Sequence, residues 1–269
     1  MRQVLTALMV TGVLMVLAAP AAADWNPGDG HKMHFPQMPD PQGWDANFTL
    51  HGFGAQLAVA DDWQCIQSGP VSDIHFWLSS RGDLAPLTGD LLVQIFDDIP
   101  AAQSGPGYSI PGERRWQHLF TPGQFSIGQW GNGDQGWFDP ARETPEILPQ
   151  DHHTIYQANL DNIPNPFFQE QGKIYWLALT VFRRIEDNEQ PATASLGWKT
   201  SLDHWNDAAV FNYAPAIGPP SWQRLEVFVT GPPLDLAFVI TPEPGTWAML
   251  MGAGALALLA CARRNRGRK

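Results

Sequence analysis

The stretch SDIHFWLSS, Ser72–Ser80, alternates apolar and polar side chains with a period of two. In an extended chain Ile74, Phe76 and Leu78 fall on one face, and the residues between them fall on the other. This pattern is typical of a β-strand with one face against a core. The stretch therefore predicts a strand of a sheet that packs on a second layer.

Short runs of the same kind recur on both sides of it, each bounded by Gly, Pro, Asn or Asp. No run in this part of the chain sustains a helical period. Ten or eleven strands without helices predict an all-β fold, an antiparallel two-sheet β-sandwich of jelly-roll-like size over residues 54–241. The other expected strands are 54–63, 90–98, 114–120, 123–130, 153–160, 173–182, 192–200, 208–213, 224–230 and 234–240.

Residues 24–53 are rich in proline and glycine and show no sustained period. We interpret them as an extended N-terminal arm laid on the sandwich.

The arm and the sandwich together differ in charge from the two ends of the chain. The formal net charge of the whole chain is −11, but residues 24–241 carry ten basic against 26 acidic residues, a net charge of about −16. Such a surface argues against nucleic acid or an anionic membrane as partner, because both require basic patches.

The N-terminus has the pattern of a secretory signal. Arg2 precedes an apolar run, and Ala21 and Ala23 form an A-x-A cleavage site, so we expect a signal helix over residues 1–23 that signal peptidase removes. An uncleaved anchor helix is the alternative. Either way, the general secretion machinery exports the body.

The C-terminus contains a second apolar segment, residues 246–262, which as a helix would rise about 25 Å, the thickness of a bilayer core. It predicts a transmembrane helix. The basic tail 263–269 would keep the C-terminus in the cytoplasm. The tail's basic residues, which we expect to act as a stop, are Arg263, Arg264, Arg266, Arg268 and Lys269.

The tripeptide Pro242, Glu243 and Pro244 stands directly before this segment. With the apolar span and the basic tail, it resembles the PEP-CTERM sorting signal of Gram-negative bacteria, over residues 242–269. The resemblance implies that an exosortase-type membrane protease removes the tail. It also implies delivery to the cell surface or the extracellular polymeric matrix. Without the resemblance, the physical reading is a single-pass membrane protein with a large external domain.

The body resembles an uncharacterised secreted β-domain found beside such tails. That resemblance implies a fold and a location and transfers no catalytic residue. It rests on the stretches VADDWQC (59–65), VSDIHFW (71–77), GKIYWLAL (172–179), LGWKT (196–200), HWNDAAVF (204–211) and DLAFVIT (235–241).

Two pairs of carboxylates end strands: Asp61 with Asp62, and Asp97 with Asp98. Neighbours on a strand point to opposite faces, so one pair alone cannot chelate an ion. Two pairs could converge on a Ca²⁺ ion, which takes six to eight oxygens. Calcium is the one cofactor considered, against the alternative of solvated loop acids.

No other motif indicates catalysis. His31 with His34, and the run Asp151-His152-His153, lack a third ligand for zinc and are interpreted as surface residues of an arm and a polar turn. There is no G-x-S-x-G or H-E-x-x-H motif. Cys65 is expected to be a buried small hydrophobe.

The 12 tryptophans suggest sugar stacking as a second possibility. Trp176 and Trp198 lie within apolar strands and are expected in the core. Trp130 and Trp137 flank the glycine-rich stretch GNGDQG, interpreted as a loop, and are the candidates for an exposed sugar-binding pair. Weaker candidates are Trp77, Trp116, Trp205 and Trp222.

Together these features predict an exported surface or matrix protein, processed at its tail, structural or adhesive and not an enzyme. A carbohydrate-binding module acting in the exopolysaccharide is the first alternative. A secreted glycoside hydrolase, which needs only two carboxylates at suitable separation, is the second.

Overall fold

The computed structural model describes residues 25–50, 55–84, 89–142, 144–182, 195–215, 221–227 and 233–241. Within them the chain forms β-strands and one short 3-10 helix, η1 (Arg81–Asp83), and no α-helix, which confirms the all-β expectation. The predicted signal helix and C-terminal helix lie outside the described residues. The strands are β1 (Trp44–Asn47), β2 (Thr49–Leu50), β3 (Ala55–Gln64), β4 (Gly69–Pro70), β5 (Asp73–Ser80), β6 (Asp90–Ile99), β7 (Ile110–Phe120), β8 (Ser126–Asp139), β9 (Glu146–Leu160), β10 (Phe168–Gln169), β11 (Ile174–Phe182), β12 (Leu196–Ser201), β13 (Val210–Pro215), β14 (Trp222–Arg224), β15 (Asp235–Leu236) and β16 (Phe238–Thr241).

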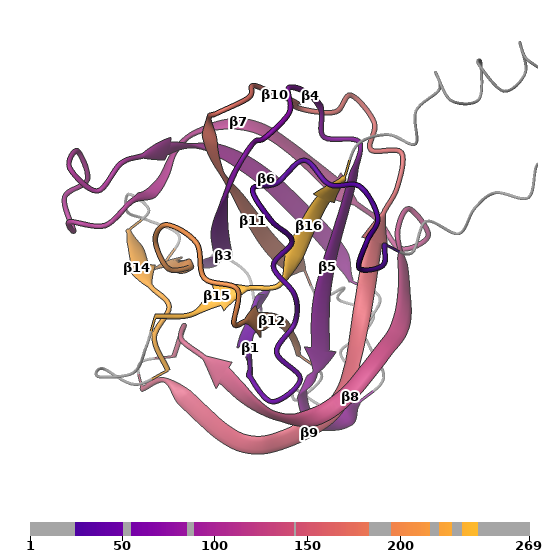
Figure 1. The fold of residues 1–269 in the computed structure, drawn as a ribbon. Helices are drawn as coiled ribbons and strands as arrows, with labels where there is room; N and C mark the ends of the chain where they lie inside the picture. Colours follow the sequence, from indigo (N-terminus) through magenta and orange to yellow (C-terminus); the bar gives the residue numbers. More distant parts are fainter. Residues whose placement is uncertain are drawn as a thin grey trace, which may run out of the picture.

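The first sheet has the strand order β15-β12-β1-β8-β9-β5-β16. A further pairing of β12 with β5 joins β12, β1, β8, β9 and β5 into a closed ring. The long strands β8 and β9 curve together around one side of the molecule (Figure 1). The expectation of purely antiparallel pairing is wrong here, because β1 pairs with β8 in parallel.

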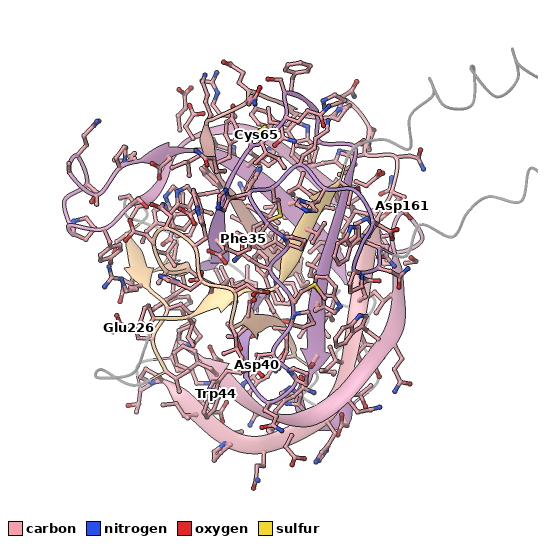
Figure 2. All side chains as sticks on the ribbon, in the orientation of Figure 1. Phe35, Asp40, Trp44, Cys65, Asp161 and Glu226 are labelled. Atoms are coloured by element: carbon pink, nitrogen blue, oxygen red, sulfur yellow. The ribbon has the colours of Figure 1, made fainter. Side chains whose placement is uncertain are left out.

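The second sheet has the order β14-β13-β3-β11-β6-β7, and β2 pairs in parallel with β11. Strands β4 and β10 form a separate two-stranded ladder. The main core lies between the two large sheets and contains residues of both, such as Val93 and Leu177 from the second and Phe76 and Phe238 from the first. Figure 2 shows the side chains that fill this space.

All eight residues of β5 are buried, which differs from the half-buried strand that the alternation predicts. Ile74, Phe76 and Leu78 belong to the core as expected. The opposite face is also covered, and Trp77 is 0% exposed. Ser79 is covered inside the ring, where β5 pairs with β12, and the Trp77 ring is covered by the rings of Trp25 and Trp130.

Residues 24–53 are more than an arm. Their last part forms β1 and β2, which are integral to the two large sheets. The segment before β1 is held by isolated bridges, which are Met33 to Cys65, Gln37 to Phe238 and Pro39 to Ser201.

Cys65 is buried, as predicted, and lies at the same end of the molecule as β4 and β10 (Figures 1 and 2). Its Sγ donates to the carbonyl oxygen of Gln67 at 3.2 Å. Burial raises the pKa of the thiol. These are the properties of an inert core cysteine.

Trp198 provides a test of the core. It is 0% exposed, and its ring lies edge-on to Phe76 and Phe238 with centroids 6.0 and 5.7 Å away. Its Nε1 donates to the carbonyl of Ala237 at 2.9 Å. We expect Trp198→Ala to lower the free energy of unfolding by about 3–5 kcal/mol in urea titration, since truncating a buried indole leaves a cavity.

The matched control is Leu202→Ala, because the Leu202 side chain is 81% exposed. It should change the free energy of unfolding by less than about 0.5 kcal/mol. Equal losses in the two variants would contradict the position of Trp198 at the centre of the core.

Candidate binding groove on the second sheet

The face of the second sheet that is turned away from the core is hollowed by a groove of about 640 Å³. Every strand of that sheet contributes to its lining. Ala58 of β3 lies in its lining. Ala60 and Ala178 lie on the same face of β3 and β11, beside the buried Trp176.

One wall of the groove is aromatic. The rings of Phe96 on β6 and Trp222 on β14 meet edge to face, with centroids 5.9 Å apart. Tyr108 supports this wall, since its hydroxyl donates to the carbonyl of Trp222 at 3.3 Å. The guanidinium of Arg224 lies 4.5 Å from the centre of the Tyr108 ring. The wall is therefore held by a cation–π contact and a hydrogen bond.

Aliphatic residues make up most of the rest of the lining, and the polar residues among them are Gln94, Gln117, Thr180, Asn212 and the charged Arg114. Gln94 Nε2 donates to Gln117 Oε1 at 3.4 Å. Asn212 is 6% exposed, and its side-chain oxygen accepts no hydrogen bond from the described residues. A buried acceptor without a donor is rare in folded proteins and indicates a position for water or a ligand hydroxyl.

This arrangement suits a ligand with one apolar face and several hydroxyl groups. The aromatic wall can cover the apolar face, and the amides can donate to and accept from hydroxyls. An apolar cavity with a few convergent polar groups is the usual form of a ligand site. Of the tryptophans weighed from the sequence, Trp222 is the one that lies in the groove.

The two tryptophans predicted as an exposed pair lie in β8 of the first sheet and do not line the groove. The expected exposure of Trp137 is wrong, because its side chain is 1% exposed and its ring faces His152 inside the ring of strands. Trp130 is 38% exposed and rests edge-on against Trp77. Trp176 and Trp198 are both 0% exposed, which confirms the prediction that they are core residues.

The predicted carboxylate pairs divide as adjacent strand residues should. Asp61 accepts from the backbone N–H of Leu236 at 2.6 Å, whereas Asp62 accepts from the side-chain amide of Asn206. In the second pair, Asp98 accepts from Trp176 Nε1 at 2.9 Å, and Asp97 lies 3.6 Å from Arg115. The four carboxylates thus have four separate partners and do not converge on one point.

Some of these residues join a larger group of interacting carboxylates, which we call the acid cluster and which consists of Asp61, Asp62, Asp98, Asp207 and Asp235. Burial, and then the charge of neighbouring aspartates, raises the pKa of Asp61 and of Asp62 well above the ordinary value. Burial also raises the pKa of Asp98 and of Asp235. Within the described ranges, no three or more His, Cys, Asp or Glu side chains are arranged to hold a metal ion.

His152 was missed by sequence reasoning, which interprets it as a surface residue of a polar turn. It lies within β9, its side chain is 0% exposed, and Nε2 is 2.9 Å from Asp45 Oδ2. Burial by itself lowers the pKa of His152, but the hydrogen bond and charge of Asp45 outweigh it, so the pKa is raised. The predicted strand begins at residue 153, whereas β9 begins at Glu146, and within that longer strand the exposed His153 would have indicated that His152 faces inward.

The sorting and processing residues lie outside the described residues. These are the cleavage residues Ala21 and Ala23, the tripeptide 242–244, the span 246–262 and the basic tail 263–269. In the part of the chain that the structure describes, no helix is both long and apolar enough to cross a membrane.

Comparison with protein families gives two matches. Residues 33–241 match a domain of unknown function, DUF7901, and residues 241–264 match the PEP-CTERM protein-sorting motif. The second match confirms the resemblance drawn from Pro242, Glu243 and Pro244. Comparison with curated proteins and with solved structures gives no match.

Proposed function

This chain belongs to the family of the domain of unknown function DUF7901, and we propose that its groove binds polysaccharide outside the cell. The PEP-CTERM motif marks an exported protein with an outer location that an exosortase sorts through its C-terminal tail. A polysaccharide of the surface or the extracellular matrix is then an abundant ligand in the surroundings of the exported protein. The role is adhesive and non-catalytic, and the body holds the protein to that polymer.

The observation that carries the proposal is the groove on the second sheet. Phe96 and Trp222 give it an aromatic wall, and the unpaired oxygen of Asn212 requires a donor. A sugar ring supplies both an apolar face and hydroxyl donors. A long chain of sugars also suits a groove that is open at the surface rather than a closed cavity.

The test is binding of the exported chain to a panel of neutral and acidic polysaccharides by glycan array, followed by titration of the best ligand. We expect Trp222→Ala and Asn212→Ala each to weaken binding at least about tenfold, which corresponds to about 1.4 kcal/mol. Both residues line the groove. Circular dichroism should show that both variants stay folded.

Trp130→Ala is the matched control, because Trp130 is a partly exposed tryptophan on the other sheet. Its binding should equal that of the unaltered chain. Binding lost in Trp130→Ala and kept in Trp222→Ala would move the site to β8. Release of reducing sugars that Asp98→Asn abolishes would contradict the non-catalytic role in favour of a hydrolase.

A further inference from the structure

The interior of the strand ring is polar, although it is closed to solvent. Each of the five strands of the ring contributes one polar residue that is 0% exposed, and we call this set the ring cluster. Its members are Asp45 of β1, Ser79 of β5, Gln135 of β8, His152 of β9 and Lys199 of β12. The hydroxyl of Ser79 donates to Gln135 Oε1 at 2.8 Å.

Lys199 and Asp45 are the charged pair at the centre of this cluster. They lie directly opposite each other on the antiparallel strands β1 and β12. Lys199 Nζ contacts Asp45 Oδ2 at 3.0 Å, and His152 Nε2 contacts the same oxygen at 2.9 Å. The second carboxylate oxygen, Asp45 Oδ1, is buried and accepts no hydrogen bond from the described residues.

Such a pair is costly as two ions. Removing an ammonium and a carboxylate from water carries a large desolvation penalty, which the contacts of Asp45 Oδ2 with Lys199 and His152 only partly offset. Transfer of one proton from Lys199 to Asp45 removes both charges and leaves an amine against a carboxylic acid. A buried lysine that loses its proton in this way becomes a nucleophile. The fold holds the Lys199 amine against the Asp45 carboxyl group, so the two groups react without a bimolecular encounter.

We propose that Lys199 and Asp45 condense to form an intramolecular isopeptide bond. Nζ attacks the Asp45 carboxyl carbon, a C–N bond forms, and the bond from that carbon to Oδ2 breaks. Two of the three ammonium protons leave with Oδ2 as water, and the third remains on the amide nitrogen. The ion pair thus supplies all the atoms of the amide and the water, and no oxidant or other reactant is needed.

The contacts of Asp45 distinguish its two oxygens. Oδ2 is the oxygen that both Lys199 and His152 contact, so it is the one positioned to collect protons and leave. Oδ1 becomes the amide carbonyl oxygen. His152 is a positioning residue in this step, since it holds the leaving oxygen toward the lysine.

The bond would join positions 154 residues apart and close the strand ring covalently between β1 and β12. A cross-link over so long a loop stabilises chiefly by restricting the unfolded chain. In the described residues the one cysteine, Cys65, has a free thiol, so no disulfide performs this task there.

Peptide mapping of the purified full chain tests the bond. Trypsin should not cleave after an acylated Lys199, so residues 33–81 should be recovered joined to residues 185–224, one water lighter than the two peptides together. Recovery of unlinked residues 33–81 together with a peptide that ends at Lys199 would overturn the proposal, and Lys199 and Asp45 would then be an ion pair only.

Two variants identify the bonded groups. Asp45→Asn should form the same amide with loss of ammonia, so its linked peptide should have the mass of the unaltered one. Lys199→Arg keeps the positive charge but offers no nucleophilic amine, and it should give no linked peptide. A linked peptide that persists in Lys199→Arg would overturn the assignment of the lysine. The mapping of the unaltered chain decides the question even if a variant fails to fold.

Discussion

Gly133→Ala should destabilise the protein by about 3 kcal/mol or more, or prevent it from folding. A Cβ atom at this position would overlap the carbonyl oxygen of Pro41 and lie 2.6 Å from its carbonyl carbon. The obstacle is backbone, so no side-chain rotation relieves it. The turn that contains Pro41 is also fixed, because Asp40 N donates to Thr200 O at 2.9 Å and Gly136 N donates to Gly43 O at 3.0 Å. Asp40 and Trp44, on either side of this turn, are labelled in Figure 2.

Gly128→Ala is the control on the same strand, β8, because no atom lies within 4 Å of a Cβ placed there. It should change the free energy of unfolding by less than about 1 kcal/mol, with slight stabilisation because alanine restricts the unfolded chain. Thermal and urea unfolding measure both variants. A Gly133→Ala protein as stable as Gly128→Ala would show that the Pro41 turn does not pack on β8.

The same glycines show where sequence reasoning failed. The sequence predicts a loop at GNGDQG, because glycine and polar residues usually mark turns. The structure places it inside β8, which runs from Ser126 to Asp139 with register shifts against β9. Gly133 and Gly136 are needed for the close approach of Pro41 and of the Trp44 ring, not for a turn. Close backbone approach depends on a partner about ninety residues away in the chain, which a local pattern does not contain.

The alternation of side chains along the sequence predicts burial correctly where the prediction depends on a single strand. It assigned Trp176 and Trp198 to the core and separated Asp61 from Asp62 across β3. It could not show that β12 pairs with β5, and this closure buries Trp137 and His152. Alternation could not predict the groove either, because Phe96 and Trp222 come from strands that are distant in sequence.

The stability of the protein should fall as the pH rises above 3.8, the ordinary pKa of an aspartate. Burial and neighbouring carboxylates raise the pKa of Asp61, Asp62, Asp98 and Asp235. A carboxyl group with a raised pKa binds its proton more tightly in the folded than in the unfolded state, so deprotonation favours unfolding. This loss begins above the ordinary value of 3.8 and continues through the raised pKa values.

One histidine and one aspartate also contribute to this dependence of stability on pH. While Asp45 is a free carboxylate, it raises the pKa of His152 above 6.5, so the stabilising contribution of His152 is complete below that value and is lost as the pH rises through the raised pKa. The pKa of Asp83 is lowered from 3.8 to about 2, although burial opposes this, because backbone N–H groups of Thr154 and His153 bind its carboxylate. That contribution is lost as the pH falls from 3.8 toward 2. For these groups together, the maximum of stability should therefore lie near the ordinary aspartate value of 3.8, above the range in which Asp83 is protonated and below the range in which the raised carboxyl groups ionise.

Asp62→Asn isolates the contribution of the acid cluster. The neutral amide removes a buried charge from beside Asp235 and Asp98, which both raise the pKa of Asp62. The variant should be more stable than the unaltered chain at about pH 8, and the difference should shrink toward about pH 4. Asp134→Asn is the control, because the Asp134 side chain is 67% exposed. Urea titrations across this pH range measure all three proteins. A stability that rises toward pH 8, or an Asp62→Asn profile parallel to that of the unaltered chain, would refute the charge repulsion assigned to the acid cluster.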